Sequence, residues 1–437
     1  MPDFQTVRGM RDLLPEEAAM LNYVIAKARE TAELYGYGEI ITPLVEPYEL
    51  LSAKSGEEIR QRMFTFKDLG DRTVALRPEF TASIARLATT ALKTEPKPLR
   101  VFSVGSVYRY DEPQRGRYRE FWQSNFELMG SDKAEADAET ILLTNNLMKA
   151  VGLQNYSFKI GHIGILRGIL NQKGIDDKTQ NAILQLMDKK EYDKALELVT
   201  DEEWRSVLKG VLELKGETPI DTVDLIEEIV EDFEEPAAAV NNLRDVLWLV
   251  NECGCPVSTV EPAFARGLEY YTGIIFEVNV PELDVALGGG GRYDRLIEVF
   301  GGEPTPAVGV AHGLDRIALA MQAQKIAVKT RQGIRVVVIP VQETMRGYAV
   351  RIANRLKKAG VMGEFEVMGR KMRKALEDAD RRKMDYAVIV GENEMDKDSV
   401  VLRDLAKHEQ TMVKIRSLPK KIKGKAKIAK IEKVVEP

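Results

Sequence analysis

Residues 108–127 combine arginines with amide and carboxylate side chains in a regular spacing. Two alternating runs there enclose a loop with several arginines, a pattern that is typical of two strands joined by a basic loop. On the returning strand Gln123, Asn125 and Glu127 share one face, because successive side chains of a strand point to opposite sides. A core-facing strand has little reason to carry Gln123 and Glu127 beside an arginine, so we expect a polyphosphate site here that includes Arg109.

The strand that leads into the loop has small residues on one face. Ser103 and Gly105 share that face with Arg109 by the two-residue period. We therefore expect room beside these two residues, into which the Arg109 side chain points.

The stretch YRYDEPQRGRYREFWQ resembles motif 2 of class II aminoacyl-tRNA synthetases, and in particular that of the histidyl-tRNA synthetases. The resemblance continues through LRPEFT, RGLEYYTG and PAVGVAHGLDRIAL and spans most of the 437 residues. It implies a ligase that activates L-histidine with ATP to form histidyl-adenylate and then transfers histidine to the 3′ end of tRNA(His).

Four arginines carry the chemistry that the resemblance implies. Arg109 would contact the α-phosphate and the amino-acid carboxylate, Arg117 and Arg316 the terminal phosphates, and Arg266 the reacting centre. Planar guanidinium groups bind phosphate oxygens two at a time. Catalysis would then be alignment and charge stabilisation without a covalent enzyme nucleophile. Mg²⁺ is expected to accompany ATP, and no metal site made by the protein is expected.

The histidine pocket that the resemblance implies consists of Glu79, Thr81, Arg109, Gln123, Glu127, Arg266, Tyr270, Tyr271 and Tyr293. Glu79 and Thr81, which we expect to share one face of a strand, would hold the α-amino group with Gln123. A neutral imidazole has one donor and one acceptor nitrogen. Glu127 would take the donor and the Tyr271 hydroxyl would serve the acceptor, while Tyr270 and Tyr293 would form walls.

Several positions refine this expectation. Asp111 would contact the adenine amino group, although bacterial members usually have the longer Glu there. Asp315 also stands where Glu is frequent, and such choices look closer to archaeal or eukaryotic relatives. Gln114 and Arg115 in the loop are candidates for the tRNA acceptor end.

The stretch PAVGVAHGLDRIAL resembles motif 3 of the class II synthetases, and two features near it carry separate expectations. The glycine run 288–291 lacks the Lys-Ser or Lys-Thr of a phosphate-binding P-loop. We expect it to let the backbone approach the adenylate closely. His312, just before GLDR, is expected to be structural.

The expected fold class is α+β. Residues 1–166 and 251–326 would form an antiparallel-sheet catalytic domain, and the Leu- and Glu-rich residues 167–250 a helical insertion between two of its strands. Residues 327–437 alternate strand and helix signals, which indicates an α/β domain, and resemble the anticodon-binding domain shared by several class II synthetases. The end of this part is a lysine-rich tail, either an RNA-attracting segment or a solvated end.

An amphipathic pattern predicts a helix over residues 15–35, followed by a short strand that ends at Pro43. By resemblance this is motif 1, which forms the interface of a homodimer. Without the resemblance, the same helix could equally pack within its own domain.

Composition and charge limit the classes of protein to which this chain can belong. The net charge is −5, and no apolar run of 18 or more residues predicts a membrane span. Cys253 and Cys255 are too few for a disulfide framework, and no signal-peptide core is visible at the start. We therefore expect a cytoplasmic protein.

Three alternatives stay open at this stage. A regulatory relative of histidine biosynthesis would bind histidine as a signal without making adenylate, and would lack the anticodon-binding domain. A pure RNA-binding protein would not need the carboxylate-rich pocket. The fragments GHIG and KMRK resemble class I synthetase signatures, but each lacks a residue of the full motif.

Overall fold

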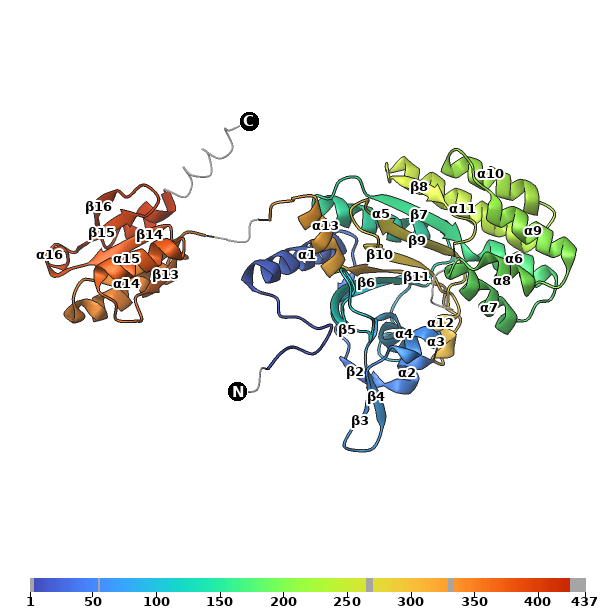
Figure 1. The fold of residues 1–437 in the computed structure, drawn as a ribbon, viewed down its shortest axis with the longest axis horizontal. Helices are drawn as coiled ribbons and strands as arrows, with labels where there is room; N and C mark the ends of the chain where they lie inside the picture. Colours follow the sequence, from blue (N-terminus) through green and yellow to red (C-terminus); the bar gives the residue numbers. More distant parts are fainter. Residues whose placement is uncertain (1–3, 54–55, 265–269, 329–332, 425–437) are drawn as a thin grey trace. The chain divides into compact units, whose positions relative to one another are not determined.

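The chain divides into two compact units, Met1–Val328 and Lys329–Pro437. A computed structural model describes residues 4–53, 56–264, 270–328 and 333–424. Each unit has its own sheet and its own hydrophobic core, and each is shown in Figure 1.

Within the described residues, an eight-stranded sheet forms the centre of the first unit, in the order β1-β5-β6-β11-β10-β9-β7-β8. Its strands are β1 (Gly38–Glu39), β5 (Leu99–Tyr108), β6 (Glu120–Met129), β7 (Ser157–His162), β8 (Val257–Val260), β9 (Ile274–Asn279), β10 (Gly288–Arg292) and β11 (Ala307–Gly313). The six strands from β5 to β7 in this order pair antiparallel, whereas the edge strands β1 and β8 pair parallel. The antiparallel catalytic sheet predicted from the sequence is therefore confirmed.

The two faces of this sheet have different cores. On one face Phe126 and Leu128 of β6 pack with α1 (Pro15–Leu34), α5 (Ala134–Ala150) and α13 (Leu314–Ala323). The opposite face packs against α4 (Thr81–Thr89) and α12 (Leu296–Val299). Because β6 alternates, its polar residues Gln123, Asn125 and Glu127 lie on this second face.

The remaining elements before β5 form a small separate layer. These are β2 (Val45–Pro47), α2 (Tyr48–Ser52), α3 (Glu57–Gln61), β3 (Thr65–Lys67) and β4 (Thr73–Leu76), with the strands in the order β2-β4-β3.

The expected helix at residues 15–35 is present as α1, with its apolar stripe buried. The strand after it is shorter than expected and ends at Glu39 instead of Pro43. The Ile40 amide still donates to Phe102 O, but the Thr42 carbonyl accepts from the Arg77 side chain at 2.9 Å. At Thr42 the Arg77 side chain therefore takes the place of strand β5 as the hydrogen-bond partner of the backbone.

Helices fill the chain between β7 and β8, and Figure 1 shows them gathered beside one end of the sheet. They are α6 (Ile163–Gln172), α7 (Asp177–Asp188), α8 (Tyr192–Glu197), α9 (Glu202–Glu213), α10 (Pro219–Val230) and α11 (Glu234–Glu252). Their starts follow capping rules: Asp176, Asp201 and Thr218 each accept backbone N–H bonds at a helix N-terminus.

The second unit is an α/β domain with its sheet in the order β13-β12-β14-β15-β16. Its elements are β12 (Arg335–Pro340), η1 (Glu343–Met345), α14 (Arg346–Lys358), β13 (Met362–Phe365), α15 (Met372–Arg381), β14 (Tyr386–Val390), α16 (Glu392–Met395), β15 (Ser399–Asp404) and β16 (Gln410–Lys414). β12 is parallel to both β13 and β14, which suits strands covered on both faces.

None of the described helices is both long enough and apolar enough to cross a bilayer.

Candidate active site

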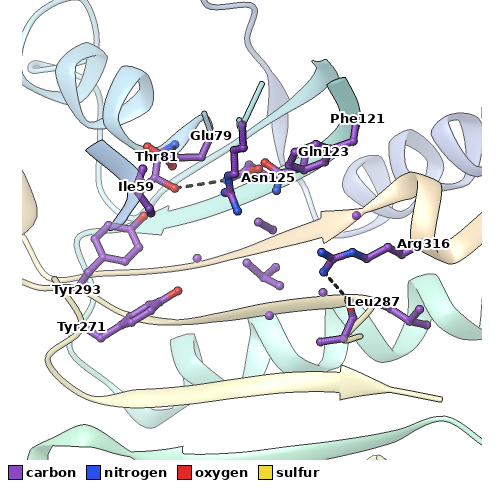
Figure 2. Close-up of a pocket in the computed structure, with 18 of the residues that line it drawn as sticks. Ile59, Glu79, Thr81, Phe121, Gln123, Asn125, Tyr271, Leu287, Tyr293 and Arg316 are labelled. Carbon is purple, nitrogen blue, oxygen red and sulfur yellow. Dashed lines mark hydrogen bonds between the residues drawn. The ribbon is translucent and has the colours of Figure 1, made fainter. Parts of the chain in front are cut away.

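A cavity of about 260 Å³ opens on the second face of the large sheet. Among the residues proposed from the sequence, its lining includes Glu79, Thr81, Arg109, Gln123, Glu127, Tyr270, Tyr271, Tyr293 and Arg316. Figure 2 shows Tyr271 and Tyr293 entering from one side and Arg316 from another. Segments more than 200 positions apart in the chain thus meet in one hollow, and Arg266 lies outside the described residues.

Glu127 lines this cavity and is only 1% exposed. One carboxylate oxygen accepts from the Thr81 hydroxyl at 2.7 Å, and the other accepts from the Tyr293 hydroxyl. Gly309 stands opposite Glu127 in the β6–β11 pairing. A Cβ there would lie 1.6 Å from Glu127 Oε2, so only glycine leaves room for this carboxylate.

Burial raises the pKa of Glu127 from its usual 4.5 to about 7. Between these two values the folded protein holds a proton that the unfolded chain has lost, so folding becomes less favourable as pH rises through this window. At about 1.4 kcal/mol per pKa unit, the full cost above pH 7 is roughly 3 kcal/mol.

Glu127→Gln removes this titration while keeping the side chain's size. Without ligand, the melting temperature of the variant relative to the wild type is therefore expected to rise from about pH 5 to about pH 8. Scanning calorimetry across that range, with the transition of the catalytic unit followed in both proteins, measures the difference. A difference that is flat or falls with pH would contradict the assignment.

Glu79 is placed differently from the sequence expectation. β4 ends at Leu76 and Thr81 is the first residue of α4, so Glu79 and Thr81 do not share a strand face. The Glu79 carboxylate accepts from the amides of Thr81 at 2.5 Å and Ala82 at 3.0 Å. It therefore caps the first turn of the helix, where unpaired N–H groups favour a negative charge.

Two amide oxygens in the cavity are buried without a hydrogen-bond partner among the described residues: Gln123 Oε1 and Asn125 Oδ1. Buried polar atoms of this kind are rare and call for an explanation such as a ligand or water. An ammonium group carries three donors and is a chemically suitable partner for such oxygens. In the sequence, Asn125 was placed on the same strand face as Gln123 and Glu127 but was not assigned to the site. Its position between these two residues was the signal that could have identified it.

Two of the cavity arginines, Arg109 and Arg316, approach from different elements. Arg109 follows β5, and its Nε donates to the Pro78 carbonyl at 2.9 Å. Arg316 is the third residue of α13, as expected for the start of that helix, and donates to Gly116 O at 3.0 Å and Ala286 O at 2.9 Å. Both guanidinium groups are thus oriented by backbone carbonyls.

The β5–β6 loop lies beside the cavity. Among the described residues, the cavity lining does not include Asp111, Gln114, Arg115 or Arg117. Asp111 forms an ion pair with Arg62 at 3.1 Å, and Arg62 itself lines the cavity. Neither Arg62 nor Asp188 was predicted from the sequence. Asp188 is the last residue of α7 and lines the cavity.

The room expected beside Ser103 and Gly105 is occupied. A Cβ at Gly105 would lie 2.7 Å from Arg77 Nη2, and the Arg77 guanidinium stacks 4.2 Å from the Phe80 ring centre. Ser103 donates its hydroxyl to Ile40 O at 2.7 Å. The expectation that Arg109 fills this space is therefore wrong, because a different arginine packs there.

The glycine run serves two purposes. Gly288 and Gly289 line the cavity. At position 290 the packing of the sheet requires glycine, since a Cβ would lie 2.1 Å from the Gly309 carbonyl oxygen of the neighbouring strand.

Two buried histidines are held by the fold. His312 Nδ1 lies 3.2 Å from the Ser124 hydroxyl and Nε2 lies 2.9 Å from the Thr144 hydroxyl. Burial lowers the pKa of His312 to about 3, so it stays neutral. His162 of the GHIG fragment caps α6 by accepting from the Gly164 amide at 3.1 Å.

No group of three or more His, Cys, Asp or Glu side chains arranged to hold a metal ion occurs in the described part of the chain. The cavity carboxylates of Glu79 and Glu127 already accept hydrogen bonds from protein groups.

Known proteins share this architecture. Residues 9–317 match the family model of histidyl-tRNA synthetase, and residues 335–425 match that of the anticodon binding domain. A protein named histidine–tRNA ligase from Methanocaldococcus jannaschii is 40% identical over 420 residues, which cover 95% of this chain and 98% of that protein. The crystal structure of histidyl-tRNA synthetase from Nostoc sp. PCC 7120 has a TM-score of 0.77 at 23% identity, covering 97% of this chain and 100% of that one. The chain therefore belongs to the histidyl-tRNA synthetase family.

One solved structure bears on the regulatory alternative. It is described as an ATP phosphoribosyltransferase regulatory subunit/histidyl-tRNA synthetase from Bacillus halodurans, with a TM-score of 0.74 at 26% identity, covering 89% of this chain and 98% of that one. A regulatory relative was expected to lack the anticodon-binding domain and phosphate-binding residues. Here residues 335–425 match that domain, and Arg109 and Arg316 line the cavity. The regulatory alternative is thus the less supported one.

Proposed function

We propose that this chain is a histidine–tRNA ligase that activates L-histidine with ATP and transfers it to the 3′ end of tRNA(His). The observation that carries the proposal is the cavity in which a buried carboxylate, Glu127, lies with Arg109 and Arg316. The Glu127 carboxylate can accept a hydrogen bond from an imidazole N–H, and the two guanidinium groups can bind phosphate oxygens. Family membership supports the same conclusion.

In this proposal the histidine side chain donates an imidazole N–H to Glu127, and the Tyr271 hydroxyl serves the other ring nitrogen. Each carboxylate oxygen has a second lone pair, so Glu127 accepts this bond while keeping those from Thr81 and Tyr293. The α-ammonium group lies among Glu79, Thr81, Gln123 and Asn125, where the two unsatisfied amide oxygens receive it. Tyr270 completes the wall of the pocket.

The amino-acid carboxylate then attacks the α-phosphorus of ATP, the new O–P bond forms the adenylate, and pyrophosphate leaves. Arg109 binds both the carboxylate and the α-phosphate, and Arg316 binds the terminal phosphates. Such donors lower the barrier because they are already aimed at the charge that develops. Mg²⁺ that accompanies ATP would neutralise part of the phosphate charge.

Residues of the β5–β6 loop, together with Arg266, have further roles in this proposal. Arg117 joins Arg316 on the terminal phosphates, and Asp111 contacts the adenine amino group. Gln114 and Arg115, both exposed at the loop, approach the tRNA acceptor end. Arg266 serves the reacting centre.

The second unit supplies the tRNA anticodon contact, and motif 1 supplies the interface of a homodimer. Exposed apolar side chains at Leu34 and Ile41, 86% and 91% accessible, favour such an interface. A cytoplasmic location is consistent with the two unpaired cysteines.

Amino-acid-dependent ATP–pyrophosphate exchange, measured with each of the twenty amino acids, tests the function. Exchange with histidine alone is the expected result, followed by charging of tRNA(His). Folded protein that binds histidine without exchange would favour the regulatory role, and exchange with another amino acid would overturn the pocket assignment.

A further inference from the structure

The segment Val7–Arg11, here called the N-terminal strap, lies against the β5–β6 loop. The Arg119 amide donates to the Gly9 carbonyl at 2.8 Å. Gly9 has a φ of +85°, and a Cβ there would lie 2.8 Å from both Arg119 Cγ and Cδ and 3.0 Å from Pro113 Cγ. Both the backbone conformation and the close approach therefore require glycine at this position.

The residue that Gly9 touches is itself fixed. Arg119 is only 4% exposed, its guanidinium lies 3.6 Å from the Tyr110 ring centre, and its Nε donates to Asp111 O at 3.2 Å. The strap thus packs on an ordered part of the loop and not on a freely moving side chain.

Arg11 connects the strap to three other elements. Its guanidinium lies 3.6 Å from the ring centre of Tyr118 in the loop, and it forms an ion pair with Asp315 of α13. The second Asp315 oxygen accepts from the Trp122 amide of β6 at 2.6 Å. Asp315 directly precedes Arg316, which in turn donates to Gly116 O of the same loop.

We propose that the N-terminal strap positions the ATP half of the active site, with Arg11 as the positioning residue that holds Arg316 and the β5–β6 loop in register. This inference rests on the proposed function for its catalytic readout. None of the contacts of Arg11 and Gly9 described above involves the histidine pocket around Glu127. The effect of the strap is therefore expected mainly on ATP.

The chemistry of Asp315 explains why Arg11 is needed. Its side chain is 4% exposed, and burial raises its pKa, whereas Arg11 acts in the opposite direction. Removing one partner of a buried pair leaves the other charge without compensation, which is strongly unfavourable. Asp315 would then take up a proton or turn toward water, and the start of α13 would shift with it.

Arg11→Ala and Gly9→Ala are the test variants, and Arg8→Ala is the matched control. Arg8 is on the same strap, but its pair with Glu112 is exposed on both sides at 73% and 79%, and such pairs contribute little. In histidine-dependent exchange, the KM for ATP is expected to rise roughly 10- to 100-fold in the two test variants, while the KM for histidine stays within about twofold. Arg11→Lys, which keeps the charge but not the planar stacking, is expected to lie in between.

Hydrogen exchange of the Trp122 amide gives a second readout that needs no activity. Its protection is expected to fall in Arg11→Ala and to stay unchanged in Arg8→Ala. Folded variants with wild-type KM for ATP, or a parallel rise in both KM values, would overturn the proposal. A wild-type protein without exchange would instead overturn the proposed function, and Trp122 protection alone would then decide whether Arg11 holds this part of the site.

Discussion

Glu127→Ala is expected to reduce histidine-dependent exchange roughly 100- to 1,000-fold, with the loss concentrated in the KM for histidine. The imidazole N–H loses its acceptor, and so do the buried hydroxyls of Thr81 and Tyr293. A site built around hydrogen bonds rejects a mismatched ligand strongly because its own polar groups are left unpaired. ATP binds through Arg109 and Arg316, so its affinity is expected to change little.

Steady-state exchange at varied histidine and at varied ATP separates the two effects, and calorimetric titration with ATP checks the second directly. Glu120→Ala is the matched control, because Glu120 begins the same strand and accepts a hydrogen bond from Tyr108 outside the cavity. An unchanged KM for histidine in folded Glu127→Ala would remove Glu127 from its proposed role.

Periodic segments were the part of the fold that the sequence predicted well. The polar face of β6 and the apolar stripe of α1 both appear where the pattern placed them. Each is long or regular enough for the alternation or the helical period to dominate. The fold class, antiparallel sheet plus α/β domain, follows from these segments together with the family resemblance.

Short-range geometry was predicted less well. LRPEFT reads equally as the end of a strand or the start of a helix, and the outcome depended on Glu79 capping α4. The space beside Gly105 was real, but no local pattern says which distant side chain fills it. Arg77, which does so, lies 28 positions away in the chain.

The residues missed in the site share one property: their role depends on contacts between distant segments. Arg62 reaches the cavity from the layer before β5, and Asp188 reaches it from the insertion. Arg11 meets Asp315 across 304 positions of sequence. One sequence contains no direct signal for such pairs, whereas Asn125 could have been found from its strand face alone.

The second large effect is expected at Arg109. Arg109→Ala should slow adenylate formation roughly 100- to 1,000-fold, the loss seen when a donor aimed at a transition-state charge is removed. Arg109→Lys should recover only a small part of that loss. The Pro78 carbonyl accepts from Arg109 Nε and so fixes the plane of the guanidinium group. Lysine has a single charged nitrogen and cannot bind that carbonyl, the amino-acid carboxylate and the α-phosphate in one fixed geometry.

Single-turnover formation of adenylate, measured at saturating histidine and ATP, isolates this step from binding. Arg100→Ala is the matched control, since Arg100 is on β5, the strand that leads to Arg109, but pairs with Glu139 of α5 at 2.8 Å, outside the cavity lining. It should lose some stability and keep its rate. If Arg109→Lys forms adenylate nearly as fast as the wild type, charge alone is sufficient at this position, and the argument from planar, bidentate recognition fails. If Arg100→Ala is slowed as much as Arg109→Ala, the effect comes from the strand and not from the cavity.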